Sequence, residues 1–266
     1  MTRHREEHMR KENPISIVII CKNEKDNIRR CLESVLWADE IVVYDTGSTD
    51  NTLEICKEYD CSIYTQAKWE GFGKAKNEAV NKAKYDWILS IDADEEVSEN
   101  LKNSILDILK TQNSHKAYRI KRSSYFMKKM IKYSGWQRDY TLKLFDRRYG
   151  NFNFKTVHEH VETKCEIGYI DDLLYHYTYP EIKTHIAKMI YYSELGALEA
   201  IKKNKKSNIC KAIFKGIGKF IKMYFLNLGF LDGKAGFVLA TNTIFYVYLK
   251  NIYIWENTVN NKSKEI

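Results

Sequence analysis

Two aspartates separated by one residue follow directly on an apolar segment of the chain. The segment 87–91 has the sequence WILSI, and Asp92, Ala93 and Asp94 come next. A short apolar run of this kind predicts a buried strand. In an extended backbone, side chains two residues apart point the same way, so Asp92 and Asp94 are expected on one face. Two carboxylates at the end of a strand suit Mg²⁺ or Mn²⁺ held together with a phosphate-bearing ligand.

The same aspartates also fit a purely structural interpretation. Glu95 and Glu96 follow them, and acidic side chains stabilise the N-terminus of a helix without binding anything. A calcium loop does not fit, because the twelve-residue pattern with its central glycine is missing. The choice between metal site and helix start depends on the rest of the chain.

Composition indicates an ordinary folded protein. The chain has 266 residues, 44% hydrophobic and 29% charged, which allows one substantial domain plus an appendage. The net charge of +8 fits nucleic acid, an anionic membrane surface or a phosphorylated substrate as a partner. The six cysteines form no CxxC pair, which favours reduced thiols in a cytosolic protein. The charged tail 1–13 has no apolar core, so we expect no secretion signal there.

Strand and helix patterns alternate four times in the first hundred residues. Apolar or β-branched runs predict strands at 15–20, 41–44, 62–65 and 87–91. Helical spacing of apolar residues follows each of them: over 24–37, at Leu53, Cys56 and Tyr59, at Ala75, Ala79 and Ala83, and at Val97, Leu101, Ile105 and Ile108. This alternation predicts an α/β fold with a mostly parallel sheet, in which ligands bind at the carboxyl ends of the strands.

The second half of the chain has a different rhythm. Strands are expected at 117–125, 140–145, 152–161 and 167–177. After Pro180 the pattern becomes helical, and a helix from about 209 has isoleucines on one side and lysines on the other. Such a basic amphipathic helix suits an anionic bilayer surface over 209–225, although packing on the main domain explains it equally well. The apolar run at 236–249 is too short to span a bilayer.

A nucleotide, if bound, must be held by side chains. The first strand-to-helix turn, CKNEKDN, lacks the glycine fingerprint of dinucleotide binders, and no GxxxxGK[ST] motif occurs. Asp45, at the end of the second strand, is placed to accept from a ribose hydroxyl or a base N–H.

Four segments occur in a distinctive order: ISIVIICKNE, IVVYDTGSTDNT, GFGKAKNEAV and WILSIDADEE. Together they resemble family 2 glycosyltransferases, which are inverting enzymes with the GT-A fold. The resemblance continues through GWQRDYTLKLFDRRYG, KTVHEHVE and LLYHYTY, and it covers about residues 14–255. This later stretch resembles the bacterial subgroup that includes lipooligosaccharide β-1,4-glucosyltransferases. The resemblance implies a Rossmann-like sheet with a helical C-terminal appendage. The implied domains are a tail at 1–13, a catalytic domain at 14–180 divided into 14–115 for the nucleotide sugar and 116–180 for the acceptor, and a helical region at 181–266.

The resemblance also assigns roles to individual residues of the donor site. Glu24 and Asp45 would line the nucleotide pocket, and Asn77 would lie near the ribose or pyrophosphate with Lys76 beside it. Asp92 would meet the ribose or sugar. The metal, Mg²⁺ or Mn²⁺, would be bound by Asp94, with Asp92 and His176 as further candidates.

Glu159, in the segment VHEH, matches the acceptor-side acid of the family. A carboxylate at that place would deprotonate the acceptor hydroxyl as it attacks the anomeric carbon in a single displacement, while the metal neutralises charge on the departing nucleoside diphosphate. The alternative is that Glu159 pairs with Arg138, Arg147 or Lys155 in a structural network. His158 and His160 are second-tier candidates, because an isolated histidine is more often a hydrogen-bonded structural residue.

The expected activity is transfer of a hexose, with UDP-glucose as the expected donor, to a hydroxyl of a lipopolysaccharide-core or other glycolipid acceptor. A peptide acceptor modified on Ser or Cys is the alternative within the same fold. A non-catalytic nucleic-acid-binding protein is the alternative from another class, but the basic residues are dispersed and no RNA-recognition signature occurs. A catalytically idle scaffold that binds a nucleotide sugar is a third. The expected location is cytoplasmic, peripheral on the inner face of the cell membrane.

Overall fold

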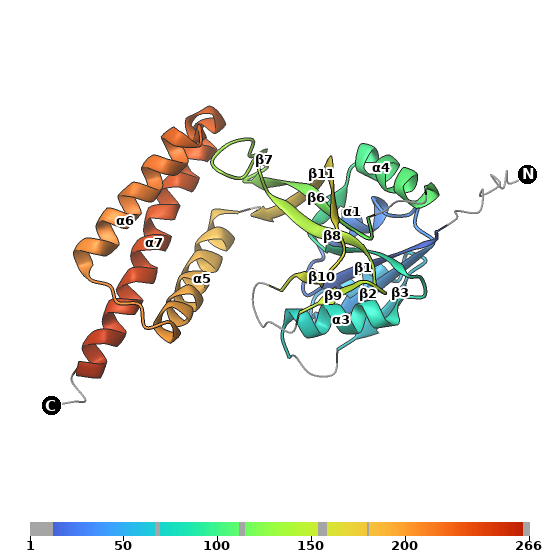
Figure 1. The fold of residues 1–266 in the computed structure, drawn as a ribbon, viewed down its shortest axis with the longest axis horizontal. Helices are drawn as coiled ribbons and strands as arrows, with labels where there is room; N and C mark the ends of the chain where they lie inside the picture. Colours follow the sequence, from blue (N-terminus) through green and yellow to red (C-terminus); the bar gives the residue numbers. More distant parts are fainter. Residues whose placement is uncertain (1–12, 67–69, 112–114, 154–158, 180, 263–266) are drawn as a thin grey trace, which may run out of the picture. The chain divides into compact units, whose positions relative to one another are not determined.

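The computed structural model describes residues 13–66, 70–111, 115–153, 159–179 and 181–262 (Figure 1). The chain divides into two compact units: unit 1 lies within 1–122 and 139–176, and unit 2 within 123–138 and 177–266. Of the predicted tail 1–13, residues 1–12 lie outside the described part of the chain. The predicted domain boundaries remain predictions, and each unit is presented below on its own.

The first four strands of unit 1 form a parallel sheet in the order β3-β2-β1-β4. All seven residues of β1 are buried, as expected for a β-branched strand with neighbours on both sides. The four strands are β1 (Ile15–Cys21), β2 (Glu40–Asp45), β3 (Ser62–Thr65) and β4 (Trp87–Asp92). They agree with the predicted strands to within one residue at every end.

Helices cover both faces of this sheet. Residues from α1 (Ile28–Glu33), α2 (Thr52–Cys56) and α4 (Glu99–Lys110) pack in one apolar cluster on one face. Helix α3 (Phe72–Lys82) packs on the other face, where Ala75 and Ala79 allow close approach to the strands. The alternation of strand and helix thus produces a sheet covered on two sides (Figure 1).

The second half of unit 1 extends the sheet with antiparallel strands, in the order β4-β8-β6-β11-β5. These strands are β5 (Glu95–Val97), β6 (Ala117–Phe126), β8 (Tyr140–Asp146) and β11 (Ile167–Tyr179). β6 and β11 continue from unit 1 into unit 2. The result is a parallel-rich mixed sheet with covering helices, which confirms the predicted α/β fold class.

Three predicted elements differ from the structure. The helix predicted over 24–37 is regular only over α1, and turns complete the segment. Val97 was expected on a helix but lies on β5, because Ser98 caps α4 by accepting a hydrogen bond from the Leu101 backbone N–H at 3.2 Å. The strand predicted over 152–161 is replaced by the antiparallel pair β9 (Gly150–Phe152) and β10 (Val161–Thr163), with 154–158 outside the described residues.

Unit 2 is mainly helical, as predicted for the C-terminal region. Helix α7 (Gly233–Lys262) packs against both α5 (Ile182–Lys202) and α6 (Ile209–Ile221). A π-helical turn η1 (Lys222–Leu226) and a 3-10 turn η2 (Gly229–Asp232) join α6 to α7, and β7 (Lys129–Met130) pairs with β6. None of the helices in the described part of the chain has the combined length and apolar character needed to cross a bilayer.

Candidate active site

The polar residues predicted to converge lie where the order of the parallel strands reverses. β1 is central, with β2 on one side and β4 on the other. Ligands of open α/β sheets bind at the carboxyl ends of strands beside such a switch point. The register places Cys21 beside Asp45 and Ile20 beside Asp92. Asp45 and Asp92 therefore reach the same edge of the sheet, as the sequence predicted.

The expectation that Asp92 and Asp94 share a face of an extended strand was wrong. β4 ends at Asp92 and β5 begins at Glu95, so the chain turns at Ala93 and Asp94. Two-residue alternation holds only while the backbone stays extended. The two carboxylates consequently have different partners.

Asp92 is paired with two lysines. Its Oδ2 lies 2.8 Å from Nζ of Lys143 and its Oδ1 lies 3.0 Å from Nζ of Lys76. Burial alone would raise the pKa of Asp92, but the charges of Lys143 and Lys76 outweigh it and hold this pKa well below its usual range. With its charge already offset, Asp92 is better suited to accepting hydrogen bonds from a sugar or ribose hydroxyl than to binding a metal ion.

A second group of charged side chains, formed by Glu95, Arg122 and Asp139, lies beside the turn that follows β4. The side chain of Glu95 is fully buried, and its Oε2 accepts from Nζ of Lys143 at 2.7 Å and from the backbone N–H of Asp92 at 2.9 Å. Nη1 of Arg122 lies 3.6 Å from the other oxygen of Glu95, while Nη2 of Arg122 lies 2.8 Å from Oδ2 of Asp139. Burial lowers the pKa of Arg122, and the carboxylates of Glu95 and Asp139 raise it further than burial lowers it. The network fixes the position of the Asp92 backbone.

The family resemblance did not point to Lys143, Glu95 or Arg122. The available signal was Lys143, a lysine between two leucines of the strand 140–146, where a charge must be paired if it is buried. Its side chain is only 8% exposed, which confirms that the charge is internal. The partner could not be identified from sequence, because it depends on the order of the antiparallel strands.

Glu159 is connected to Asp92 by an ion pair with Lys76. Nζ of Lys76 lies 2.9 Å from Oε1 of Glu159 and 3.0 Å from Oδ1 of Asp92, so one ammonium joins the two acids. Burial lowers the pKa of Lys76, but Asp92 and Glu159 raise it by more, so this pKa lies above its usual value. Lys76, predicted only to lie beside Asn77, thus contacts both acids of the cluster.

Of the three alternative partners predicted for Glu159, Arg147 has other contacts, and the pairing with Arg138 stays a prediction. Arg147 donates to the carbonyl oxygens of Val80 and Ala83 and pairs with Asp86. Lys155 and His158 lie outside the described residues. His160 contacts Asn153 and lies 3.7 Å from Glu162, away from the lysine-bridged acids.

Asp94 and His176 form the remaining part of the site. The antiparallel pairing of β11 with β5 places His176 opposite Glu95, and Nε2 of His176 lies 3.3 Å from Oδ2 of Asp94. Both side chains are largely buried: that of His176 is 15% exposed and that of Asp94 is 16% exposed. Carboxylate oxygen and imidazole nitrogen are both ligands of Mn²⁺-type ions.

These two side chains fit a divalent ion that is only partly coordinated by protein. Within the described residues, no three His, Cys, Asp or Glu side chains cluster in the manner of a closed metal site. An ion held by Asp94 and His176 would therefore take further ligands from water and substrate phosphates, the usual arrangement for Mg²⁺ in nucleotide enzymes.

Asp45 and Glu24 shape the loops beside the sheet edge. The carboxylate of Asp45 is buried and accepts from the backbone N–H groups of Gly47 and Ser48 at 3.0 Å and from the Ser48 hydroxyl at 2.5 Å. Glu24 accepts from the side-chain amide of Asn27 at 2.8 Å. A carboxylate has about four acceptor positions, so Asp45 retains little capacity beyond its own loop.

Asn77 is bound within the protein at both ends of its amide. Its Nδ2 donates to the carbonyl oxygen of Phe152 at 2.7 Å, and its Oδ1 accepts from the Phe152 N–H at 3.0 Å. Asn77 therefore attaches α3 to β9, the strand that leads into the segment containing Glu159.

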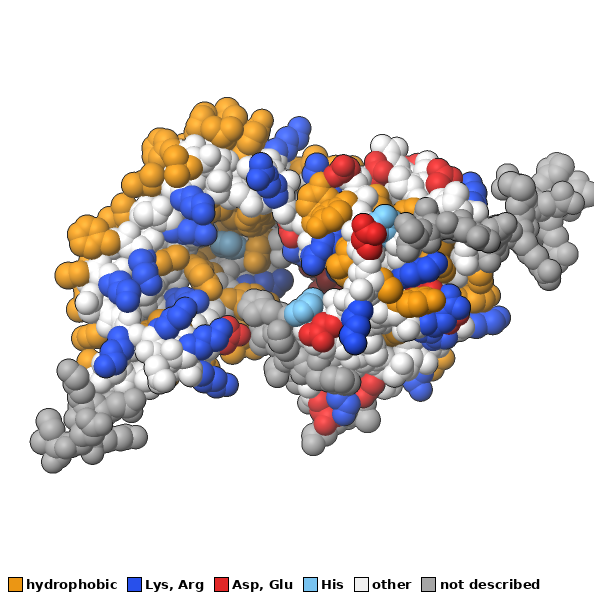
Figure 2. All heavy atoms as spheres, in the orientation of Figure 1, with side chains coloured by type: hydrophobic (Ala, Val, Ile, Leu, Met, Phe, Trp, Pro, Cys, Tyr) orange, Lys and Arg blue, Asp and Glu red, His pale blue; other side chains and the backbone are white. Residues whose placement is uncertain are grey.

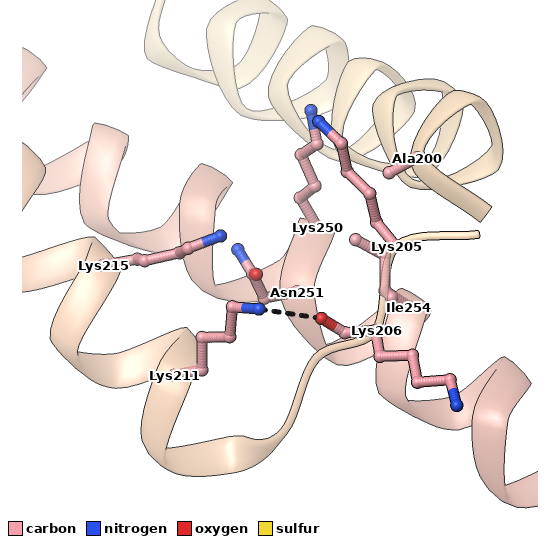
Figure 3. A pocket seen from close by; sticks show the side chains of 8 residues that line it. All are labelled: Ala200, Lys205, Lys206, Lys211, Lys215, Lys250, Asn251 and Ile254. Carbon is pink, nitrogen blue, oxygen red and sulfur yellow. Dashed lines mark hydrogen bonds between the residues drawn. The ribbon is translucent and has the colours of Figure 1, made fainter. Parts of the chain in front are cut away.

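Unit 2 contains a separate cavity of about 270 Å³ (Figure 3). Of the eight described residues that line it, five are lysines and none is acidic. Nζ of Lys211 donates to the carbonyl oxygen of Lys206 at 2.9 Å across its edge. This cavity has none of the predicted active-site residues.

Comparison with known proteins identifies the family. A model of "Glycosyl transferase family 2" matches residues 16–176. An uncharacterized glycosyltransferase of Rickettsia bellii is 32% identical over 238 residues, which is 84% of this chain and 80% of that protein. The lipopolysaccharide core biosynthesis glycosyltransferase LpsC of Rhizobium meliloti is 27% identical over 249 residues, 91% of this chain and 92% of that protein.

Solved structures show a more limited likeness. Glucosyl-3-phosphoglycerate synthase from Mycobacterium tuberculosis, in complex with Mn²⁺, UDP and glucosyl-3-phosphoglycerate, is 20% identical, with a TM-score of 0.38 over 41% of this chain and 44% of that chain. The family model matches more than half of the chain and includes Asp45, Asp92, Asp94 and Glu159. The chain therefore belongs to glycosyltransferase family 2.

Proposed function

We propose that this glycosyltransferase moves a hexose from a UDP-sugar to a hydroxyl of a glycolipid acceptor, with inversion at the anomeric carbon. The observation that carries the proposal is the bridge from Asp92 through Lys76 to Glu159. It brings the acid expected at the donor sugar and the acid expected at the acceptor to either side of one ammonium group.

Glu159 is the proposed general base. Its carboxylate takes the proton of the acceptor hydroxyl while the acceptor oxygen forms a bond to the anomeric carbon. The bond from that carbon to the β-phosphate oxygen breaks at the same time, and UDP leaves with the electron pair. The ion pair with Lys76 orients the carboxylate, and the attack from the face opposite the leaving group inverts the configuration.

Asp92 is proposed to bind a hydroxyl of the ribose or sugar, and Lys143 and Lys76 hold its carboxylate in place. Asp94, with His176, is proposed to hold Mg²⁺ or Mn²⁺. When bound, this ion would neutralise charge on the leaving diphosphate. Asp45 and Glu24 are proposed to shape the nucleotide pocket, and Asn77 to position β9 and the segment after it.

The glycolipid acceptor is proposed from the similarity to LpsC, whose name assigns that protein to lipopolysaccharide core biosynthesis. Radiolabelled UDP-glucose can be incubated with a lipopolysaccharide-core acceptor and, separately, with Ser- and Cys-containing peptides. Label in the glycolipid supports the proposed acceptor, and label in peptide alone would replace it.

An acceptor-independent experiment tests the chemistry. Water can replace the acceptor, and hydrolysis of α-linked UDP-glucose by an inverting enzyme releases β-glucose before mutarotation, which proton NMR distinguishes from α-glucose. We expect β-glucose first, and a rate lower by about 10²–10⁴-fold in Glu159→Gln. Glu162→Gln, which changes an exposed acid three residues away, is the matched control and should keep the wild-type rate. α-Glucose as the first product, or an unaffected Glu159→Gln variant, would refute the proposed mechanism.

A further inference from the structure

Unit 2 presents an extensive apolar surface to solvent between residues 209 and 237. This 209–237 segment comprises α6, η1, η2 and the first turn of α7. Phe214 is 75% exposed and Leu226 is 73% exposed. Figure 2 shows hydrophobic side chains gathered along α6 and at the turn that joins it to α7. Eleven large apolar residues of the segment are exposed: Ile209, Ile213, Phe214, Ile217, Ile221, Phe225, Leu226, Leu228, Phe230, Leu231 and Phe237.

Helix α6 packs on its neighbour with its smallest residues. Ala212 and Gly216 are its buried positions, and a Cβ at Gly216 would lie 3.0 Å from Cγ2 of Ile244 on α7. Ile213 and Ile217 each follow one of these positions by a single residue and remain exposed. A helix that only served to pack on its own domain would bury its large apolar side chains. In α6 these large apolar side chains are instead exposed, where they can contact an apolar surface outside the protein.

The exposed charges of the segment are all positive. It contains five lysines, each exposed: Lys211, Lys215, Lys219, Lys222 and Lys234. Its one acidic residue, Asp232, is buried and accepts hydrogen bonds from the backbone N–H groups of Lys132 and Tyr133 and from the Ser134 hydroxyl. An apolar surface bordered by unneutralised lysines is complementary to an anionic lipid surface.

The lysine-lined cavity of unit 2 adds to the positive charge near the 209–237 segment. Lys211 and Lys215 share the cavity with three lysines from outside the segment, and its lining includes no carboxylate among the described residues (Figure 3). Burial, and then the charges of Lys211 and Lys205, lower the pKa of Lys215. Such mutual repulsion is relieved when the unit lies against negative charge.

The connection between η1 and η2 contains a leucine in a left-handed conformation. Leu228 has φ of +55°, a left-handed conformation that is unfavourable for residues with a Cβ and that Gly or Asn adopt more readily. The residue is 42% exposed. Its backbone N–H donates to the Phe225 carbonyl oxygen at 3.2 Å, and its carbonyl oxygen accepts from the Leu231 N–H at 2.9 Å. The left-handed turn thus connects η1 to η2 and leaves Leu228 on the exposed apolar surface.

We propose that the 209–237 segment binds the interface of an anionic lipid bilayer. Its phenylalanine and aliphatic side chains enter the region below the headgroups, and its lysines pair with lipid phosphates. A second copy of the chain is a poorer occupant, because a two-fold contact through this surface would place lysines against lysines. If the proposed function also holds, the enzyme would bind its acceptor at the membrane surface. Only this last consequence rests on the proposed function.

Vesicle cosedimentation of the full chain tests the proposal. We expect the wild type to bind vesicles of equal parts phosphatidylcholine and phosphatidylglycerol, to bind phosphatidylcholine vesicles weakly, and to release from the anionic vesicles as salt is raised. Phe214→Ser/Leu226→Ser should weaken partitioning into the vesicles by about tenfold or more, because the double variant loses the favourable free energy of burying these apolar groups in the bilayer. Lys219→Gln/Lys222→Gln should weaken binding only to the anionic vesicles.

Controls separate loss of the surface from loss of the fold. Leu36→Ser/Tyr169→Ser removes two apolar side chains of unit 1 that are 58% and 66% exposed, and it should bind vesicles like the wild type. Circular dichroism and UDP binding in solution should be unchanged in all three variants, so a failure here is distinct from a failure of the proposed chemistry. The proposal is overturned if the wild type ignores anionic vesicles or if the Phe214/Leu226 variant binds them equally well. A wild-type dimer that this variant converts to monomers, without vesicle binding, would also overturn it and identify the surface as a self-interface.

Discussion

Lys76 of α3 places its ammonium nitrogen 2.9 Å from Oε1 of Glu159, which lies in the loop before β10 and is far away in the sequence. The Lys76 side chain is 9% exposed and that of Glu159 is 16% exposed, so water screens this pair only weakly. The same ammonium contacts Asp92. One lysine thus couples the position of the proposed base to the end of β4.

Replacing Lys76 should destabilise the protein. Lys76→Met leaves the carboxylates of Glu159 and Asp92 without this partner, and loss of one partner of a buried pair typically costs about 3–5 kcal/mol. We expect a loss of about 3 kcal/mol in the free energy of unfolding, near the low end, because a third of the Asp92 side chain is exposed. Urea denaturation followed by circular dichroism measures it.

Lys74→Met is the matched control for this substitution. Lys74 lies two residues earlier on α3, its side chain is 40% exposed and it pairs with Glu70. Exposed pairs contribute little, so the change in unfolding free energy should stay within about 0.5 kcal/mol. Equal effects of the two substitutions would show that the bridge to Glu159 and Asp92 has no special energetic role.

His185 should make the stability of unit 2 depend on pH. Its ring packs in T-shaped geometry with the rings of Phe126 and Tyr179, at centroid distances of 5.1 and 4.5 Å. Burial, and then the charge of Lys188, lower the pKa of His185 below its ordinary value. The unfolded chain, with a histidine pKa of about 6.5, therefore binds the proton more readily than the folded chain.

The sign follows from that difference in proton binding. The contribution of His185 is fully present above about pH 6.5 and is lost as the pH falls toward the pKa of the folded state. We expect the free energy of unfolding to fall between about pH 7 and pH 5 more steeply in the wild type than in His185→Phe. Denaturant titrations across this range measure both slopes, and parallel curves would contradict the prediction.

The cysteines should differ in reactivity toward a thiol reagent. Cys210 is exposed, whereas Cys21, Cys31 and Cys56 are buried. Burial is the main cause that raises the pKa of Cys56 to about 12, and it also raises the pKa values of Cys21 and Cys31 well above the usual value. Reaction of the native protein with Ellman's reagent, followed by peptide mass spectrometry, should label Cys210 first and the three buried thiols only after unfolding. Early labelling of Cys31 would mean that β1 and α1 open readily.

The parallel half of the fold was predictable because its signals are local. The β-branched run 15–20 and the apolar run 87–91 are short, unbroken and bounded by polar turns, and both are strands in the structure. A parallel arrangement puts the carboxyl ends of all four strands at one edge of the sheet, whatever the order of the strands. The order β3-β2-β1-β4 itself was not predicted. Asp45 and Asp92 could therefore be placed at one edge from sequence alone.

The electrostatic partners within the site were not predictable in the same way. Lys143 reaches Asp92 because β8 pairs antiparallel with β4, and no local pattern in the strand 140–146 specifies that neighbour. The turn at Ala93 and Asp94 separates two aspartates that alternation would have aligned. Both outcomes depend on long-range strand pairing, which residue spacing does not encode.

The most direct test of the account is calorimetric titration of UDP into the wild type and Asp94→Asn, each with and without Mn²⁺. If Asp94 holds an ion that contacts the diphosphate, Mn²⁺ should tighten UDP binding to the wild type by about tenfold or more, and Asp94→Asn should lose that gain while remaining folded. UDP binding that is independent of Mn²⁺ and unaffected by Asp94→Asn would contradict the proposed donor site.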